Sequence, residues 1–475
     1  MAREQPRTSL ATHHKQTLWC YWLLILLGLW TVVAPATFGY LGEPSQLGRE
    51  VWLSQDARGW AMAASDVVSG LLLVVFGWRS LKPDRPKSLW TCCFVGLWMS
   101  AAPLLFWAPN SAAYLNATLV GALVVALAVL IPGIPNELKF IKSDASIPEG
   151  WSFNPSSWPQ RGVLILLAFF GWMVARYLAA YQMGYIDGAF EPFFGHQALG
   201  SSLFGGGTHE VLDSELSHGA PVSDGGLGAL AYTLEFLLAW AGPTNRWRTM
   251  PWLVTLFGIL IIPLGLVHVF LVISQPVIVG AWCTLCILAA AIALPMIALA
   301  APEVAAMIQH VKKHVDGGEG FWEVFWKGGQ GQEAREDDQS PELTSLADHP
   351  GPVARASFWG VSWSWWLYIC TGIGVWLMFA PAVFGFDETT AAYLHQVSGA
   401  LIVTFSVIST SEPIRRARFA NILFGLFVAV GPWLVGGIGT TAGILATACG
   451  LLVIGLSIPR GRKNHAFGWW DRFVS

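Results

Sequence analysis

Long apolar stretches with few charged residues recur along the whole chain. Each is close to 20 residues long, which is enough for a helix to cross the hydrocarbon core of a bilayer. A helix satisfies its own backbone hydrogen bonds there, whereas an irregular segment does not. The twelve predicted spans are approximately 18–38, 60–78, 89–107, 112–132, 162–183, 225–242, 251–273, 277–299, 361–384, 391–410, 419–435 and 439–457. They form three sets of four and predict an all-α, polytopic membrane protein.

The composition agrees with this fold class. Charged residues make up 12% of the 475 residues, about half of the roughly 25% that is typical of soluble proteins. The mean hydropathy is +0.52, and the chain contains 26 Trp. These values exclude a soluble enzyme, a disordered chain and a nucleic-acid binder, so membrane lipid is an expected partner and nucleic acid is not.

The placement of basic residues predicts the orientation. Of 27 Lys and Arg, 24 lie in termini and loops on one side of the predicted topology, whereas Arg49 and Arg58 lie on the other side and Arg176 lies within a span. Cytoplasmic loops carry the excess of Lys and Arg. Both termini are therefore expected in the cytoplasm. The first span could instead be a signal peptide ending near Ala34-Pro35-Ala36, but Gly28 to Pro35 belongs to a repeat, which favours a span.

A short pattern is repeated four times in the outer thirds of the chain. It consists of glycine, an apolar residue and an aromatic residue, followed by a small residue and proline. The copies begin at Gly28, Gly96, Gly374 and Gly425, and a second shared string begins at Ala112 and Ala391. We interpret the copies as helical hairpins that pack through small residues, with Trp at the membrane interface. The repeat resembles the SPW-repeat membrane module, which has no assigned chemistry.

These features divide the chain into seven segments. The expected boundaries are a cytoplasmic N-terminus (1–17), a four-helix repeat block (18–133), a cytoplasmic connector (134–161), a central four-helix domain (162–310), a cytoplasmic linker (311–358), a second four-helix repeat block (359–460) and a cytoplasmic tail (461–475). Within the linker, Phe321-Trp322 and Phe325-Trp326 predict a short helix on the membrane surface. A partner-binding site is the alternative there.

The central block contains a Cys-x-x-Cys motif, Cys283-Thr284-Leu285-Cys286, about six residues into a span that begins at the outer face. A pair at the N-terminal end of a helix can close a disulfide, and the helix dipole can stabilise the first thiolate. Core packing or half of a zinc site are the alternatives, but no second cysteine or histidine pair with metal-binding spacing supports zinc. The other five cysteines are expected to be packing residues.

The central block resembles the vitamin K epoxide reductase family. The resemblance rests on residues in the family's order and spacing: Val211 to Ser214, Gly228, Tyr232-Thr233-Leu234, Leu237-Leu238, Arg246-Trp247 and the Cys-x-x-Cys motif. It implies a four-helix bundle that couples thiol oxidation to reduction of a quinone of menaquinone or ubiquinone type. Cys286 would face the quinone and Cys283 would exchange with a donor thiol, which a thioredoxin-like extracytoplasmic protein could carry. Ser214 and Asp224 would orient the quinone carbonyls.

This chain also departs from the family pattern. Thr208 stands at the position of the family's loop cysteine, and no cysteine occurs between Arg161 and Trp282. The family's shuttling pair is therefore missing, so either an outside dithiol reaches Cys283 directly or the reaction differs. Ala290 replaces a quinone-contacting Tyr of animal members, and Asp224 replaces their pocket Asn.

The loop from Gly184 to Asp224 contains no Lys or Arg, as expected of an exported segment. Of its histidines, His196, His209 and His218, we single out His209 as a possible proton carrier because it follows Thr208 and imidazole titrates near neutral pH. A solvated surface role is the alternative for each of them.

Three ionisable residues, Arg176, Glu235 and His268, lie within predicted spans. Such groups are costly in lipid and usually face the protein interior. They form either a structural polar contact or a proton path.

The sequence therefore predicts an integral-membrane thiol and quinone oxidoreductase with the motif near the extracytoplasmic face. The alternative is a membrane scaffold or receptor that keeps a degenerate reductase-like bundle. A transporter ranks third, because no predicted span is clearly broken.

Overall fold

The computed structural model describes residues 12–47, 49–83, 85–133, 146–194, 207–328, 335–336, 350–362, 364–386 and 389–474. The described residues are predominantly helical, with one antiparallel pair of two-residue strands, β1 (Ser146–Ile147) and β2 (Arg335–Glu336). The chain divides into two compact units. Unit 1 comprises residues 1–142, 172–189 and 215–242, and unit 2 comprises residues 143–171, 190–214 and 243–475.

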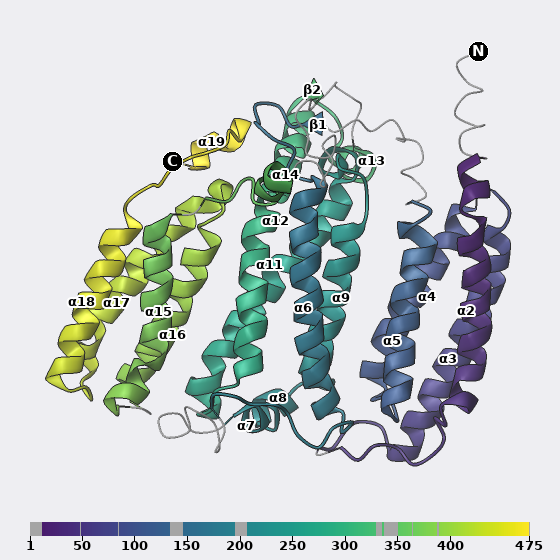
Figure 1. The fold of residues 1–475 in the computed structure, drawn as a ribbon, viewed down its shortest axis with the longest axis horizontal. Helices are drawn as coiled ribbons and strands as arrows, with labels where there is room; N and C mark the ends of the chain where they lie inside the picture. The colour runs from purple at the N-terminus through teal and green to yellow at the C-terminus, as the bar shows by residue number, and fades with distance from the viewer. Residues whose placement is uncertain are drawn as a thin grey trace. The chain divides into compact units, whose positions relative to one another are not determined.

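Unit 1 contains the first repeat block. Its helices are α2 (Leu18–Thr37), α3 (Gln55–Ser80), α4 (Pro86–Leu105) and α5 (Ser111–Val125), which continues as a π-helical turn, η1 (Ala126–Leu130) (Figure 1). The hydroxyl of Ser54 caps α3 and the amide oxygen of Asn110 caps α5. The second half of α6 (Trp158–Gln182), α8 (Glu215–His218) and α9 (Asp224–Trp240) complete the unit.

Unit 2 contains the second repeat block and the other helices of the central domain. Its long helices are α11 (Pro251–Ser274), followed by the π-helical turn η3 (Gln275–Val279), α12 (Thr284–Asp316), α15 (Trp365–Phe384), α16 (Thr390–Ile408), α17 (Ala420–Val435), which follows the 3-10 segment η5 (Glu412–Phe419), and α18 (Thr440–Ser457). Helix α16 packs against α11 and α12, which joins the repeat block to the central helices.

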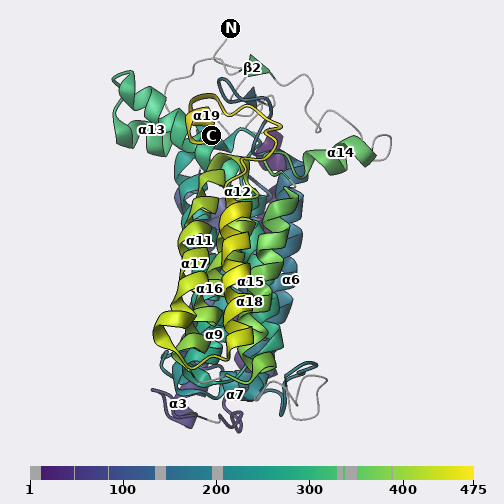
Figure 2. The same ribbon diagram turned by 90° about the vertical axis from the view of Figure 1, so that its left-hand side faces the viewer.

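Short helices lie at both ends of unit 2. Figures 1 and 2 show α7 (Thr208–Leu212) at the end where α12 begins, and α13 (Phe321–Lys327), α14 (Pro350–Ala356) and α19 (Asp471–Val474) at the opposite end. The remaining short elements of this unit are α10 (Arg246–Thr249) and η6 (Gly468–Trp470). The expected short helix in the linker is therefore present as α13, and Trp322 and Trp326 on it are exposed.

Each predicted span corresponds to a helix. Eleven helices among the described residues are long and apolar enough to cross a membrane. The remaining predicted span, 225–242, is α9, which has 17 residues. The prediction for span 277–299 was wrong at its start: Gly280 adopts a left-handed conformation, with φ of 76°, and α12 begins only at Thr284. Cys283 is consequently the N-cap of α12 and does not lie inside the helix.

The hairpins of both repeat blocks cross at paired glycines. The glycine that opens each repeated pattern faces a glycine of the following helix, in the pairs Gly28/Gly70, Gly96/Gly121, Gly374/Gly399 and Gly425/Gly450. A Cβ atom added to Gly374 would lie 2.7 Å from the carbonyl oxygen of Gly399. Only glycine allows the two backbones to approach so closely.

Candidate functional site

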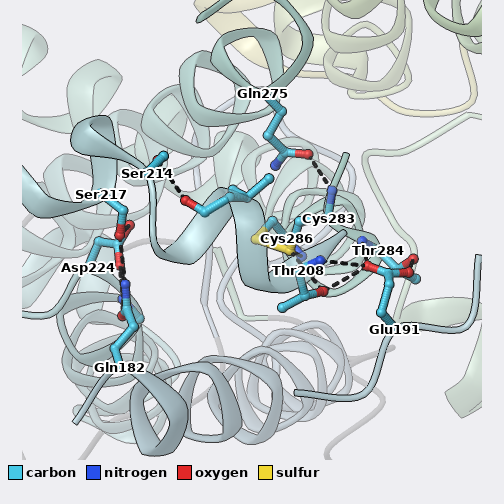
Figure 3. Close-up of a disulfide and its surroundings, with 12 residues drawn as sticks. Gln182, Glu191, Thr208, Ser214, Ser217, Asp224, Gln275, Cys283, Thr284 and Cys286 are labelled. Atoms are coloured by element: carbon cyan, nitrogen blue, oxygen red, sulfur yellow. Dashed lines mark hydrogen bonds between the residues drawn. A yellow bond between two sulfur atoms is a disulfide. The ribbon is translucent and has the colours of Figure 1, made fainter. Parts of the chain in front are cut away.

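Cys283 and Cys286 form a disulfide at the N-terminus of α12 (Figure 3), with their Cα atoms 5.3 Å apart. The left-handed Gly280 ends the preceding π-helical turn and redirects the chain into α12. The backbone N–H of Cys283 donates to Gln275 Oε1 at 2.9 Å, and the N–H of Cys286 approaches Cys283 Sγ at 3.1 Å. Local backbone geometry thus places both sulfurs at the helix start. Cys283 is fully buried, whereas Cys286 is half-buried.

Thr208, the residue at the position of the family's loop cysteine, lies against the disulfide. It is the first residue of α7, it is fully buried, and its Oγ1 is 3.5 Å from Cys283 Sγ. The same hydroxyl is 2.7 Å from Glu191 Oε2. A hydroxyl has one proton to donate, and the carboxylate is the stronger and nearer acceptor. Thr208 therefore donates to Glu191 and covers Cys283.

Glu191 is the functional candidate that sequence reasoning missed. Its carboxylate accepts six hydrogen bonds, from the backbone N–H groups of Phe193, Phe194, Thr208 and Thr284 and from the hydroxyls of Thr208 and Thr284. Figure 3 shows the carboxylate facing Thr208 and Thr284. The only available signal was one acidic residue within the apolar stretch Phe190 to Phe194.

The hydrogen bonds also determine the charge of Glu191. Burial alone would raise the pKa of this carboxyl, but the bonds from Thr284, Thr208 and Phe193 outweigh burial and hold the pKa below its ordinary value of 4.5. Glu191 is therefore ionised at neutral pH, beside the N-terminus of α12.

Three aromatic rings form an apolar wall that includes Trp282, the residue before Cys283. Trp282 lies with its ring centroid 4.8 Å from Phe379 and 6.2 Å from Phe194. Phe194 and Phe379 stack at 6.0 Å. Phe379 belongs to α15, so the second repeat block contributes directly to the surroundings of the cysteine pair.

The polar residues predicted from the family pattern lie in different units. Ser214 is in unit 2, where its hydroxyl donates to the carbonyl oxygen of Val211 at 2.7 Å. Asp224 is in unit 1 at the start of α9, where its carboxylate accepts hydrogen bonds from the side chains of Gln182 and Ser217. Asp224 thus has structural partners of its own at this helix start.

The structure describes two of the three histidines in the loop from Gly184 to Asp224. His209 is the second residue of α7, directly after Thr208. His218 ends α8 in unit 1. His196 lies outside the described residues.

The ionisable residues within the spans also have local partners. The guanidinium of Arg176 lies over the rings of Trp172 and Tyr114, at 4.7 and 5.4 Å from their centroids. Glu235 is buried on α9, and among the described side chains no ion pair joins it to Arg176. The Nδ1 atom of His268 is 2.9 Å from the carbonyl oxygen of Leu264 on its own helix.

A buried ion pair fixes α12 far from the cysteines. Arg246 donates through two nitrogens to the carboxylate of Glu303, at 2.6 and 2.7 Å, and Ser156 donates to the same carboxylate. Both charged side chains are at most 2% exposed. The Arg246-Trp247 motif therefore has a structural role in anchoring α12.

Comparisons with known proteins agree with the division into three blocks. Residues 162–301 match the vitamin K epoxide reductase family, and residues 18–131 and 362–459 match the SPW repeat domain. No curated protein and no solved structure matches the chain. The reductase match supports an oxidoreductase in general terms. The chain is thus a polytopic, predominantly helical membrane protein in which a segment that matches the vitamin K epoxide reductase family lies between two segments that match the SPW repeat domain.

Proposed function

We propose that this protein is a membrane thiol and quinone oxidoreductase in which the Cys283–Cys286 pair is the redox-active centre. The observation that carries the proposal is the disulfide at the N-terminus of α12, within the segment that matches the reductase family. A dithiol on the extracytoplasmic side, carried for example by a thioredoxin-like protein, reduces the pair. The reduced pair then transfers two electrons and two protons to a quinone of menaquinone or ubiquinone type, which is released as the quinol.

The two cysteines have different roles in this proposal. Cys286 is half-buried and faces the quinone. Cys283 is fully buried beneath Thr208, so exchange with a donor thiol requires the segment at α7 to move away. When the pair is oxidised again, Cys283 and Cys286 both lose their protons, two electrons pass to the quinone, and the two Sγ atoms form the disulfide. The apolar rings of Phe194 and Trp282 fit an apolar, planar acceptor.

The proposal also assigns roles to three further polar side chains. Ser214 and Asp224 orient the quinone carbonyls, provided that Asp224 is protonated or bridged by water, because a bare carboxylate cannot donate a hydrogen bond. His209 carries a proton near the pair.

The distribution of basic residues supports an extracytoplasmic site. In unit 2, Arg246 pairs with Glu303 in the half of α12 remote from Cys283, and Lys312 and Lys313 lie still closer to its C-terminal end. Basic residues concentrate on the cytoplasmic side of membrane proteins. The cysteine pair at the opposite end would then face the outside, with both termini in the cytoplasm.

Trapping of the cysteine pair tests this function. The membrane-embedded protein is reduced, incubated with or without a quinone, and alkylated differentially. Protection of Cys283 and Cys286 from alkylation after quinone addition is expected, and Cys449, a half-buried cysteine of α18, serves as the internal control. If the two cysteines stay reduced with quinone and never form a disulfide under oxidising conditions, the proposed function is wrong.

A membrane scaffold or receptor is the second candidate function. It is favoured by Thr208 in place of a loop cysteine and by the complete burial of Cys283, because both obstruct the usual electron relay. This candidate predicts that the purified protein shows no quinone-dependent dithiol oxidation and that a Cys283→Ser variant behaves in cells like the parent protein. The reductase proposal predicts the reverse in both assays.

A further inference from the structure

One carboxylate joins three separate parts of the chain at the cysteine pair. Glu191 accepts hydrogen bonds from Phe193 and Phe194 in its own loop, from Thr208 at the start of α7, and from Thr284 at the start of α12. These hydrogen bonds fasten residues 191–194 and the start of α7 to the N-terminal end of α12. The burial of Cys283 is consistent with this fastening.

The carboxylate also accepts the hydrogen bond of a backbone N–H group that would otherwise stabilise a thiolate at this position. Thr284 N–H is the first amide of α12, and free amides at a helix N-terminus stabilise an adjacent thiolate. Here that amide donates to Glu191 Oε2 at 3.0 Å. The Thr208 hydroxyl likewise donates to Glu191 and not to sulfur. Of the donors identified around Cys283 Sγ, the Cys286 N–H remains available.

The negative charge of Glu191 acts in the same direction. A single hydroxyl oxygen, 2.7 Å from the carboxylate and 3.5 Å from Cys283 Sγ, separates the two groups. A like charge so near disfavours ionisation of the thiol. From the sequence, we expect the N-terminus of the helix to stabilise a thiolate on the first cysteine. In the structure, the negative charge of Glu191 opposes this stabilisation.

We propose that Glu191 is a positioning residue that keeps the reduced Cys283 as a neutral thiol and holds the start of α7 over it. This inference rests on the proposed function and deepens it. When the donor dithiol reduces the disulfide, two electrons and two protons enter the pair, the donor becomes a disulfide, and Cys283 retains one of the protons. Cys286 is then the sulfur that ionises first, and it is the less buried of the two.

Other titratable side chains occur on the elements packed against this end of α12. They are His209 and Glu210 of α7, Asp213 directly after α7, His268 of α11 and His395 of α16. Glu210 is exposed and follows Thr208 by two positions, so Glu210→Gln removes a charge from the same segment without altering the six bonds of Glu191. It is the matched control.

The test compares the full-length protein with its Glu191→Gln variant in lipid nanodiscs. Both are reduced, and the rate of Cys283 alkylation is measured from pH 5 to 10 by mass spectrometry of the peptide. In Glu191→Gln, the midpoint of the rate profile should move to lower pH by about one unit. Glu210→Gln should leave the midpoint unchanged, and Glu191→Asp should restore it at least in part.

Two outcomes overturn the proposal. In the first, Glu191→Gln raises the alkylation rate equally at every pH with no shift of the midpoint, which shows that the carboxylate only holds the loop. In the second, Glu210→Gln shifts the midpoint as much as Glu191→Gln does, which shows a general charge effect. Thr208→Val provides a second variant: it removes the bridging hydroxyl but keeps the charge, so its midpoint must stay above that of Glu191→Gln.

Failure of this inference is distinguishable from failure of the proposed function. Quinone-dependent oxidation of the reduced pair is measured separately on the unmodified protein. The alkylation profile needs no quinone, so the two results are independent.

Discussion

At the residue scale, the charge of Glu191 makes the closed loop sensitive to acid. The pKa of this carboxyl is raised by burial, but its hydrogen bonds lower the value below the ordinary 4.5. A group whose pKa is lowered by folding contributes stability above its unfolded pKa, and the contribution is lost as pH falls through the folded pKa. The bonds to Thr208 and Thr284 are thus stable at neutral pH and weaken in acid.

Hydrogen exchange of the loop measures this dependence. After correction for the intrinsic exchange rate, protection of peptides covering 190–194 and 207–214 should be constant between about pH 5 and 8 and should fall below about pH 4. In Glu191→Gln the protection should be lower at neutral pH and independent of pH. Loss of protection already near pH 7 in the parent protein would contradict this assignment.

The buried pair of Arg246 and Glu303 predicts a large effect of a single substitution. Removing one partner leaves an uncompensated buried charge, which costs about 3–5 kcal/mol. Arg246→Met should lower the free energy of unfolding in mixed micelles by that amount, and adding Glu303→Met should recover much of the loss. The control is Asp316→Asn in the exposed pair with Lys312, which should change stability by less than about 0.5 kcal/mol. If Arg246→Met and Asp316→Asn changed the free energy of unfolding equally, the anchoring role of the buried pair would be disproved.

The sequence identified some site residues and not others, for physical reasons. Cys283 and Cys286 were found because their spacing within one helical turn is itself the chemical signal. Glu191 was missed because its partners are mostly backbone N–H groups, one of them 93 positions away, and backbone donors leave no mark on a sequence. The expected roles of Ser214 and Asp224 stay predictions.

At the element scale, the repeated hairpins depend on glycine at each crossing. Gly374 of α15 faces the backbone of Gly399, whereas Gly372 on the same helix has open space around its Cα. Gly374→Ala should therefore destabilise the second repeat block by about 1–3 kcal/mol through overpacking. Gly372→Ala should be neutral or stabilising by up to about 1 kcal/mol, because alanine favours helix. Thermal unfolding in detergent checks both, and equal effects would refute the close crossing.

The sequence predicted one of the two glycines at each helix crossing. The first glycines stood out because they belong to a repeated pattern with an aromatic residue and proline. The partner glycines, Gly70, Gly121, Gly399 and Gly450, also share a flanking string, in which Leu or Ala, then Leu and two aliphatic residues follow the glycine. Apolar residues of this kind are common in every span, so the string did not stand out, and the pairing emerges only when the backbones are seen to meet. The start of α12 was misplaced for a similar reason, since the apolar stretch continues across the left-handed Gly280 where the helix is interrupted.

At the scale of the whole molecule, the second repeat block contributes to the surroundings of the cysteine pair in unit 2. Phe379 on α15 packs against Trp282, and α16 packs against both α11 and α12. The sequence placed the repeat blocks on either side of the reductase domain. It could not predict this wall, because the contact joins segments that are far apart in the chain and depends on how the helices pack.

Removal of this ring tests the role of the repeat block. Phe379→Ala removes the ring that packs against Trp282, so Trp282 should become more accessible to an aqueous quencher, and the rate at which a soluble dithiol reduces the adjacent disulfide should increase. Val375→Ala, at an exposed position on the same helix, is the control and should leave both values unchanged. If the repeat block only flanked the central domain, Phe379→Ala and Val375→Ala would give the same rate of disulfide reduction and the same accessibility of Trp282.

The most direct test of the account is a single turnover of the purified protein. The protein is reduced, freed of reductant without oxygen, and mixed with one equivalent of a menaquinone or ubiquinone analogue, and quinol and free thiols are quantified together. The account predicts one quinol formed for each Cys283–Cys286 disulfide regained, and no quinol from Cys286→Ser. Quinol formation without loss of these two thiols, or a regained disulfide without quinol, would contradict it.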